Sequence, residues 1–540
     1  MESVVLASYI LGILGFLVIL IFFWYYGGFG FPWYCSLSLL LTLSIALVQT
    51  VCLLPIDASN SLFGSKIHDK KIGEALIALY WTSMIMGWFL TPLLTSLYTY
   101  RYGLTRKARF MYALKYNVKW YLWAGLLVII GIIVMVFTKG MKFSDLIPLV
   151  MALSNAYSLL LLCLLLGYGF ISLPRSLWKF ADIDVLKSFY YHRIHDEFDD
   201  LVQSVVNAKE VLRIGQNSVN QVKELHRDQY NECINPRILF LESVIAKETF
   251  LENKHLDKAT PERFIEKYSN AKWNQFIDND LEDFLEVFDS ATANLNHSVS
   301  FFIDSIENAE NCIKNTAVPS CWIGFRLVFM RCFSIIIGII CLISFWGEMV
   351  MMYKPSWSVF YILSHLKMSP LYGQLFVTSP IVLFLIYVGS WSLTKVKIGN
   401  YFRFIKGASS DNTFYFFIVL LGRLAPTIGY HYLLQVGGYN SQTIKIWFPS
   451  TQVAFFGSFW PLYIPILMLL VGVFVYFDVW DQILNFFGLK IFTFDESIRK
   501  YDDYNQGRKI LNEIRPSTAS MLQPMEDLSI DNPLINKYNW

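Results

Sequence analysis

Two histidines and two aspartates near the middle of the chain are the side chains best suited to binding a metal. His192, His195, Asp196 and Asp199 are spaced so that a helix would bring all four onto one face. A divalent ion could accept such ligands. Because charged helix faces are common without any metal, we predict no metal site here and no cofactor.

The sequence has no motif for the common catalytic sites. It contains no phosphate-binding Gly-x-x-x-x-Gly-Lys loop, no Gly-x-Ser-x-Gly nucleophile turn and no His-Glu-x-x-His metal helix. We therefore predict that the protein is not an enzyme and that it has no catalytic residues.

The most informative single residue is Arg423, about ten residues from either end of the apolar run 413–434. A charge at the centre of a membrane helix costs about 2.5–3.5 kcal/mol on insertion scales, so it usually faces a partner or a cavity. Asn155 falls at a similar depth in another run, and Pro426 frees the carbonyl of Gly422. Two interpretations stay open. In the first, Arg423 is structural and connects the interrupted helices. In the second, Arg423, Asn155 and Pro426 form a site for a ligand or a lipid headgroup.

These residues lie among long apolar runs, which set the fold class. The 540 residues are 55% hydrophobic and 16% charged, whereas a soluble domain carries about 25% charged residues. A run of about 20 apolar residues crosses the hydrocarbon core as a helix. We predict an all-α polytopic membrane protein with about nine transmembrane helices, at residues 4–25, 33–54, 72–98, 118–137, 146–173, 322–345, 371–393, 413–434 and 453–477. The first run has no basic n-region, so we interpret it as a span rather than a signal peptide.

The distribution of basic residues predicts the orientation. Cytosolic loops of membrane proteins are enriched in Lys and Arg. Two loops fit that pattern, with Arg101, Arg106, Lys107, Arg109 and Lys115 in the first, and Lys395, Lys397, Arg403 and Lys406 in the second. We therefore predict an extracellular or lumenal N-terminus and a cytosolic C-terminus. The plasma membrane and an endomembrane of the ER or the endolysosome are both open as locations.

A long polar insertion separates the first five predicted spans from the last four. Apolar residues recur there at alternating steps of three and four, from Ile194 to Val222 and again from Leu281 to Ile313. This period is typical of coiled coils, and two such stretches can fold back as an antiparallel pair. We predict four regions: spans one to five at 1–173, a cytosolic coiled-coil insertion at 174–320, spans six to nine at 321–480, and a cytosolic tail at 481–540.

Several motifs in the two membrane halves resemble the limb-region (LMBR/LMBD) family of multipass membrane proteins. They are Leu53-Leu54-Pro55-Ile56-Asp57, Tyr80-Trp81-Thr82-Ser83, Leu164-Leu165-Leu166-Gly167-Tyr168-Gly169, Leu173-Pro174-Arg175-Ser176-Leu177-Trp178, Gly422-Arg423-Leu424-Ala425-Pro426 and Leu484-Asn485-Phe486-Phe487-Gly488-Leu489. The second half is most similar to the second LMBR-domain-containing branch. The resemblance implies nine spans with a cytosolic coiled coil between the fifth and the sixth. It also implies a link to lipocalin uptake, cobalamin export or receptor signalling, without an established catalytic site.

Two classes of function remain. The first is a non-enzymatic membrane adaptor or accessory subunit, with other membrane proteins or receptors as partners beside the spans and cytosolic proteins bound by the coiled-coil insertion. The second is a lipid or small-solute transporter, or a lipid-handling subunit, with a cavity at Arg423. Transporters often contain an internal repeat, and five spans do not pair with four, which favours the adaptor. Membrane lipids are expected neighbours in either case. The net charge of +2 does not indicate nucleic acid as a partner.

Overall fold

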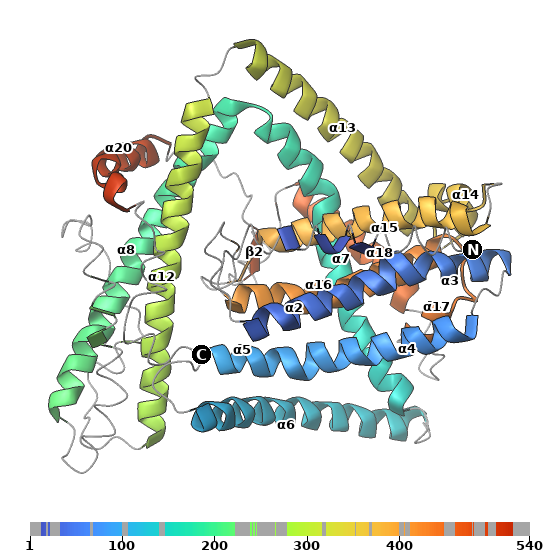
Figure 1. Ribbon diagram of the computed structural model, residues 1–540, viewed down its shortest axis with the longest axis horizontal. Helices are drawn as coiled ribbons and strands as arrows, with labels where there is room; N and C mark the ends of the chain where they lie inside the picture. The colour runs from blue at the N-terminus through green and yellow to red at the C-terminus, as the bar shows by residue number, and fades with distance from the viewer. Residues whose placement is uncertain are drawn as a thin grey trace. The chain divides into compact units, whose positions relative to one another are not determined.

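The computed structural model describes residues 33–64, 69–99, 106–139, 146–221, 278–315, 320–366 except 352, 370–398, 411–447, 460–477, 492–494 and 504–521. It also describes single residues between 12 and 21, between 238 and 245, and at 265, 404 and 479. The fold is all-α, apart from one ribbon in which β1 (Val396–Ile398) pairs antiparallel with β2 (Phe492–Phe494) (Figure 1). The chain divides into two compact units, the first made of residues 1–98, 112–179 and 327–497 and the second of residues 99–111, 180–326 and 498–540.

The first unit contains the apolar helices. They are α2 (Trp33–Leu47), η1 (Val48–Leu53), α3 (Leu54–Phe63), α4 (Asp69–Ile85), η2 (Met86–Leu90), α5 (Thr91–Thr99), α6 (Arg106–Lys139), α7 (Leu146–Phe180), α13 (Ser320–Val350), η6 (Pro355–Trp357), α14 (Val359–Ser364), α15 (Pro370–Lys395), α16 (Asp411–Gln435), α17 (Gln442–Trp447) and α18 (Trp460–Tyr476). The labels η1 and η2 mark π-helical turns, and η6 is a 3₁₀ turn. A few terminal residues of α5, α6, α7 and α13 belong to the second unit.

Six helices in the described part of the chain are long and apolar enough to cross a membrane. They are Ser36–Phe63, Asp69–Leu97, Leu153–Phe180, Trp322–Val350, Gly373–Lys395 and Thr413–Gln435. Each coincides with one of the predicted runs, which confirms the all-α polytopic fold class. The predicted run 4–25 falls mostly outside the described residues. The run 118–137 lies within α6, and 453–477 overlaps α18, whose apolar part Tyr463–Tyr476 is shorter. The count of nine spans therefore stays a prediction.

Beside each of the two π-helical turns, a proline frees a backbone carbonyl that accepts a hydrogen bond from a neighbouring helix. Proline has no N–H to donate to the carbonyl four residues earlier, so that carbonyl needs another donor inside a membrane. In η1, the carbonyl of Val51 is freed by Pro55, and the hydroxyl of Ser379 of α15 donates to it at 3.5 Å. Tyr121 of α6 donates to the carbonyl of Trp88, which Pro92 frees beside η2. In both cases the interrupted helix gains a hydrogen bond to a neighbouring helix.

The most enclosed helix of the first unit is α16. In its membrane-length window 89% of the residues are buried, against 17% in α13, so α16 forms the centre of the bundle and α13 part of its surface. The helix ends in a Schellman motif, in which Gly438 N–H reaches the carbonyl of Leu433 at 2.8 Å and Gly437 adopts φ +79°. A charged residue on α16 is therefore enclosed by protein rather than by lipid.

The second unit is built on two long antiparallel helices, α8 (Ile183–Gln221) and α12 (Asp278–Asn315), with α20 (Tyr504–Met521) packed on α8. Contacts between α8 and α12 run in opposite order: Arg193 meets Asp304, whereas Gly215, further along, lies against Phe288. The predicted apolar positions form the buried face, including Ile194, Phe198, Leu201, Val205, Ala208, Phe288, Leu295, Val299, Phe302, Ile306 and Ala309. The coiled-coil geometry, the cytosolic location and the four region boundaries stay predictions.

Candidate functional site

Arg423 lies on α16 against the π-helical turn η2 of the neighbouring span. Its Nη1 is 2.7 Å from the sulfur of Met84, and its guanidinium carbon lies 5.4 Å from the centre of the Trp88 ring. A side chain added at Gly87 would lie in contact with the guanidinium, so the backbone of η2 approaches Arg423 closely. The residues that meet the charge are thus a thioether, an indole face and a glycine.

None of these groups neutralises the charge. Arg423 is 4% exposed, and its Nη2 has no hydrogen-bond partner among the described residues. The ionisable groups that interact with it electrostatically are the hydroxyls of Tyr80 and Tyr157, and no Asp or Glu of the described chain is among them. A buried guanidinium usually binds a carboxylate, a phosphate or carbonyl oxygens. Within the described residues, the site therefore holds a positive charge without a carboxylate and one donor nitrogen without a partner.

Asn155 lies near Arg423 but makes its own contacts. Its side-chain oxygen accepts a hydrogen bond from Tyr80 at 3.4 Å, and its amide nitrogen donates to the carbonyl of Trp447, the last residue of α17. Tyr80 also lies edge-on to the Trp447 ring, with 5.3 Å between the ring centres. Asn155 thereby holds the C-terminal end of α17, and its place in a ligand site with Arg423 stays a prediction.

Pro426 is buried in α16, three residues beyond Arg423. The hydroxyl of Thr427 donates to the carbonyl of Arg423 at 2.8 Å. The carbonyl of Gly422, which Pro426 frees, is not among the described contacts of the guanidinium. A solvating role for that carbonyl remains a prediction.

Asp57 is a buried carboxylate whose role the sequence analysis did not identify. One oxygen accepts from the backbone N–H of Gln442 at 2.9 Å, and the other accepts from the N–H and the hydroxyl of Thr443 at 2.9 and 2.6 Å. The first N–H groups of a helix have no partner within it, and a carboxylate there also interacts favourably with the helix dipole. Asp57 and Asn155 thus hold the two ends of α17. The one sequence signal was an aspartate two residues after Pro55 at the end of an apolar run.

The sequence analysis also did not identify a buried polar contact between Glu348 of α13 and His431 of α16. The distance from Glu348 Oε2 to His431 Nδ1 is 2.9 Å, and both side chains are almost fully buried. Glu348 lies just beyond the predicted apolar run 322–345. Since residues 348 and 431 are far apart in the chain, no local pattern connects them.

A second arginine shows how a guanidinium in this bundle is satisfied. Arg175, in the motif shared with the limb-region family, donates to the carbonyl of Val475 at 3.3 Å and to that of Tyr476 at 2.6 Å. Its charge also lies 5.7 Å from the centre of the Tyr476 ring. Basic groups at a helix C-terminus bind the last carbonyls and offset the dipole. Arg175 therefore has a structural role at the end of α18, and its guanidinium binds two carbonyls, whereas that of Arg423 meets the Met84 sulfur and the Trp88 ring.

The four metal-binding candidates of the sequence lie on α8 as two separate pairs. His192 is 3.5 Å from Asp196, and His195 is 4.0 Å from Asp199. Within the residues that were described, no group of three or more His, Cys, Asp or Glu side chains could hold a metal ion. The two pairs have the spacing of ordinary contacts between successive turns of one helix.

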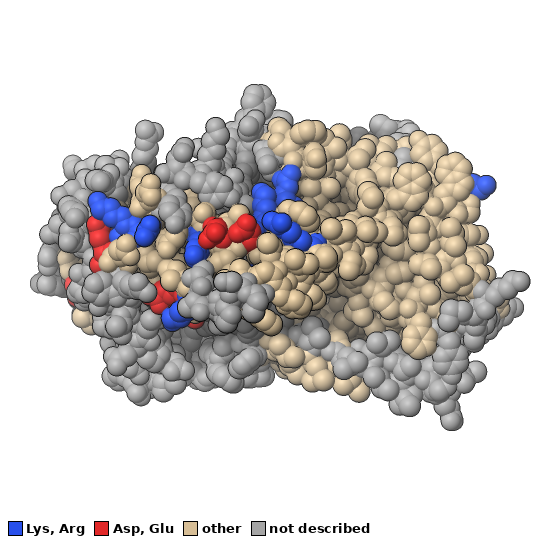
Figure 2. Space-filling view, turned by 90° about the horizontal axis from the view of Figure 1, so that it is seen from above, with Lys and Arg blue, Asp and Glu red and all other residues tan. Residues whose placement is uncertain are grey.

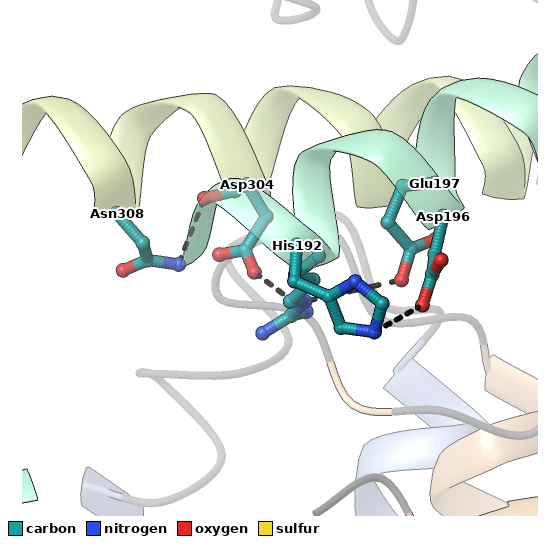
Figure 3. Close-up of polar contacts among 6 residues, drawn as sticks. His192, Asp196, Glu197, Asp304 and Asn308 are labelled. Carbon is teal, nitrogen blue, oxygen red and sulfur yellow. Dashed lines mark hydrogen bonds and ion pairs between the residues drawn. The ribbon is translucent and has the colours of Figure 1, made fainter. Parts of the chain in front are cut away.

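Polar contacts join α8 to α12 beside these histidines. Arg193 lies between Asp304 of α12, at 3.2 Å, and Glu197 of α8, at 3.8 Å. Figure 3 shows both acidic side chains, with His192 paired to Asp196 next to them. Farther along the pair, the hydroxyls of two buried serines, Ser204 and Ser298, are 2.7 Å apart. Such buried polar contacts fix which residues of the two helices face each other.

Comparison with known proteins identifies one family model and several relatives that are similar to this chain. The family model described as LMBR1-like membrane protein matches residues 3–480. "LMBR1 domain-containing protein 2 homolog A" of Dictyostelium discoideum is 22% identical over 86% of this chain and 67% of its own length. "G-protein coupled receptor-associated protein LMBRD2" of Caenorhabditis briggsae is 22% identical over 86% of this chain and 76% of its own. The Homo sapiens protein of that name is 21% identical over 81% of this chain and 67% of its own. No solved structure matches the chain.

Proposed function

The chain belongs to the LMBR1-like membrane protein family, and from this premise we propose that it is a non-enzymatic accessory subunit of membrane receptors. The observation that carries the proposal is the alignment of 81–86% of the chain with relatives named as G-protein coupled receptor-associated proteins. The proposed partner class is therefore a G-protein coupled receptor that lies beside the spans in the same membrane.

The apolar surface of the first unit supports this kind of partner. Along the part of α13 that belongs to this unit large side chains face outward, among them Phe329, Leu342 and Trp346. Figure 2 shows a broad area in which described charged side chains are nearly absent. Lipid or the spans of another membrane protein can cover such a surface. The exposed apolar side chains of α13 therefore suit contact with the spans of a partner.

The pair formed by α8 and α12 supports a second contact, with cytosolic proteins. Its two helices, of 39 and 38 residues, have their own buried core and are joined by the Arg193–Asp304 and Ser204–Ser298 contacts. A rigid helical surface loses little conformational entropy when a partner binds. With this pair on the cytosolic side, the protein would connect a receptor in the membrane to a soluble signalling or trafficking protein.

Energy transfer between the intact chain and a panel of G-protein coupled receptors in living cells tests the proposal. Donor and acceptor are fused to the chain and to each receptor, and an unrelated multipass protein at equal expression is the control. Association predicts a signal that saturates as the acceptor increases, for at least one receptor. A signal that rises linearly and equals the control for every receptor would overturn the proposal, since random collisions behave in that way.

Lipid or solute handling is the second candidate, and the observation that favours it is the buried charge of Arg423, which no carboxylate of the described residues meets. Purified protein in vesicles with a fluorescent phospholipid in one leaflet provides the test. Movement of that lipid that is fast for the native chain and slow for Arg423→Gln would support lipid handling. Equal rates with and without the protein would exclude lipid movement between the leaflets.

A further inference from the structure

We propose that Arg423 is the docking point for a single acidic side chain on a transmembrane helix of the partner. This inference rests on the proposed accessory function and deepens it by assigning the contact. The docking surface, called here the Trp88 face, is formed by exposed side chains of α4, η2 and α7, namely Ile77, Trp81, Ile85, Trp88, Tyr157 and Leu160. The guanidinium carbon of Arg423 lies 5.4 Å from the ring centre of Trp88, one of these side chains.

The charge of Arg423 provides the first step of the argument. A guanidinium carries five N–H donors, and a thioether sulfur is only a weak acceptor for one of them. The guanidinium contacts the Met84 sulfur and the Trp88 ring, and Nη2 has no partner in the described chain. By contrast, Arg175 is bound by two backbone carbonyls. Among the residues that the structure describes, the Arg423 site therefore lacks an acceptor for Nη2, and an anionic oxygen would supply it.

The second step concerns Trp88 and Tyr157, two side chains of the Trp88 face that interact with Arg423. The Trp88 and Tyr157 side chains are 37% and 46% exposed, and their ring centres are 6.5 Å apart. The Trp88 indole is held by one hydrogen bond, at 3.2 Å to the hydroxyl of Ser154. The proposal requires these two side chains to rotate so that an acidic side chain on the partner can reach Nη2.

The depth of Arg423 identifies the kind of anion. The residue lies midway along α16 (Asp411–Gln435), about 18 Å from either end of the helix at 1.5 Å per residue. The phosphate of a lipid lies outside a hydrocarbon core about 30 Å thick, so it would have to move deep into the core to reach this point. A carboxylate on a helix that crosses the membrane is already at that depth. An isolated Asp or Glu in a span is costly, and pairing with Arg423 removes that cost for both residues.

Binding of synthetic transmembrane helices to the intact chain in lipid vesicles tests the proposal. The probes are leucine–alanine helices that carry one central Glu, one central Gln, or one Glu two turns away from the centre, and binding is measured by fluorescence energy transfer. We expect the central-Glu helix to bind the native chain about tenfold more tightly than the other two, as for a polar pair in a membrane. Equal affinities for the three helices would overturn the proposal, and that outcome depends on no variant.

Two variants assign the difference to one arginine. Arg423→Gln should abolish the preference for the central Glu, whereas Arg175→Gln, which removes a guanidinium already bound to carbonyls, should retain it. Loss of the preference in both variants would indicate a general structural effect and would refute the assignment. If native mass spectrometry instead shows an anionic phospholipid bound to the native chain and absent from Arg423→Gln, and the helices do not differ, the ligand is a lipid and the proposal fails.

Photocrosslinking locates the contact. A benzoylphenylalanine at Ile85, which is 56% exposed on the Trp88 face, should crosslink to the central-Glu helix. The same group at Leu342, 68% exposed on α13, should not. Equal crosslinking at both positions would contradict the assigned surface. If receptors associate with the chain but all helix probes bind equally, only the docking point is refuted. If the central-Glu helix binds preferentially but no receptor associates with the chain, only the receptor function is refuted.

Discussion

Replacement of Asp57 tests how α17 is held in the bundle. The change Asp57→Ala removes the acceptor of two backbone N–H groups and one hydroxyl, at 2.9, 2.9 and 2.6 Å. Thr443, which supplies two of these donors, is 5% exposed, so water cannot replace the carboxylate there. Each unsatisfied buried donor costs about 1–3 kcal/mol, and the two donors of Thr443 alone therefore cost about 2–6 kcal/mol.

Hydrogen exchange of the α17 amides in detergent or lipid nanodiscs measures this loss. At about 1.4 kcal/mol per factor of ten, the lower limit of 2 kcal/mol predicts exchange about 30-fold faster across residues 442–447. Asp57→Asn should give an intermediate effect, because an amide offers one acceptor oxygen where the carboxylate offers two. Helix α12, in the other unit, should exchange unchanged and acts as the internal reference.

Asp69→Ala is the matched control. Asp69 accepts a 3.0 Å hydrogen bond from the side chain of Gln442, so it touches the same end of α17 without binding its backbone. Because water can replace it at this partly exposed position, we expect less than a threefold change in exchange. Asn155→Leu, at the opposite end of α17, should accelerate exchange as Asp57→Ala does. If Asp57→Ala and Asp69→Ala give equal rates, the reasoning about α17 is wrong.

Three further predictions concern the second unit. Burial lowers the pKa of His297 to about 4, below its usual 6.5. The stability contributed by the neutral side chain is therefore complete above pH 6.5 and is lost as the pH falls toward 4. Unfolding temperatures measured over that range should fall with pH, and His297→Gln should reduce this pH dependence. Gly507 of α20 lies against a backbone carbonyl of α8 with no room for a side chain, so Gly507→Val should release α20 to proteolysis, whereas the exposed Gln506→Ala should not. Ser204→Ala and Ser298→Ala should each lower the unfolding temperature, while the double replacement should cost less than the sum of the two, because no hydroxyl is then left unpaired.

The spans and the apolar face of the second unit could be predicted because they depend on local sequence. A run of apolar residues forms a membrane helix whatever its neighbours are, and six of the predicted runs coincide with described helices of sufficient length. The step of three and four that includes Ile194, Leu201 and Phe302 likewise indicates one helix face, and these side chains are buried. The costly charge of Arg423 was visible for the same reason, since its depth follows from its place within one run.

The partners of the buried polar groups could not be predicted, because they come from distant parts of the chain. Asp57 caps a six-residue helix that begins 385 residues later, and Asn155 reaches a carbonyl 292 residues away. Hydropathy ranks each residue by itself and does not say which helices become neighbours. The sequence by itself thus determined the helices and the position of Arg423. Only the tertiary structure decided that Asp57 and Asn155 bind α17, and that the guanidinium of Arg423 meets a thioether and an indole. The physical reason is that side-chain packing determines which helices become neighbours when all of them are equally apolar.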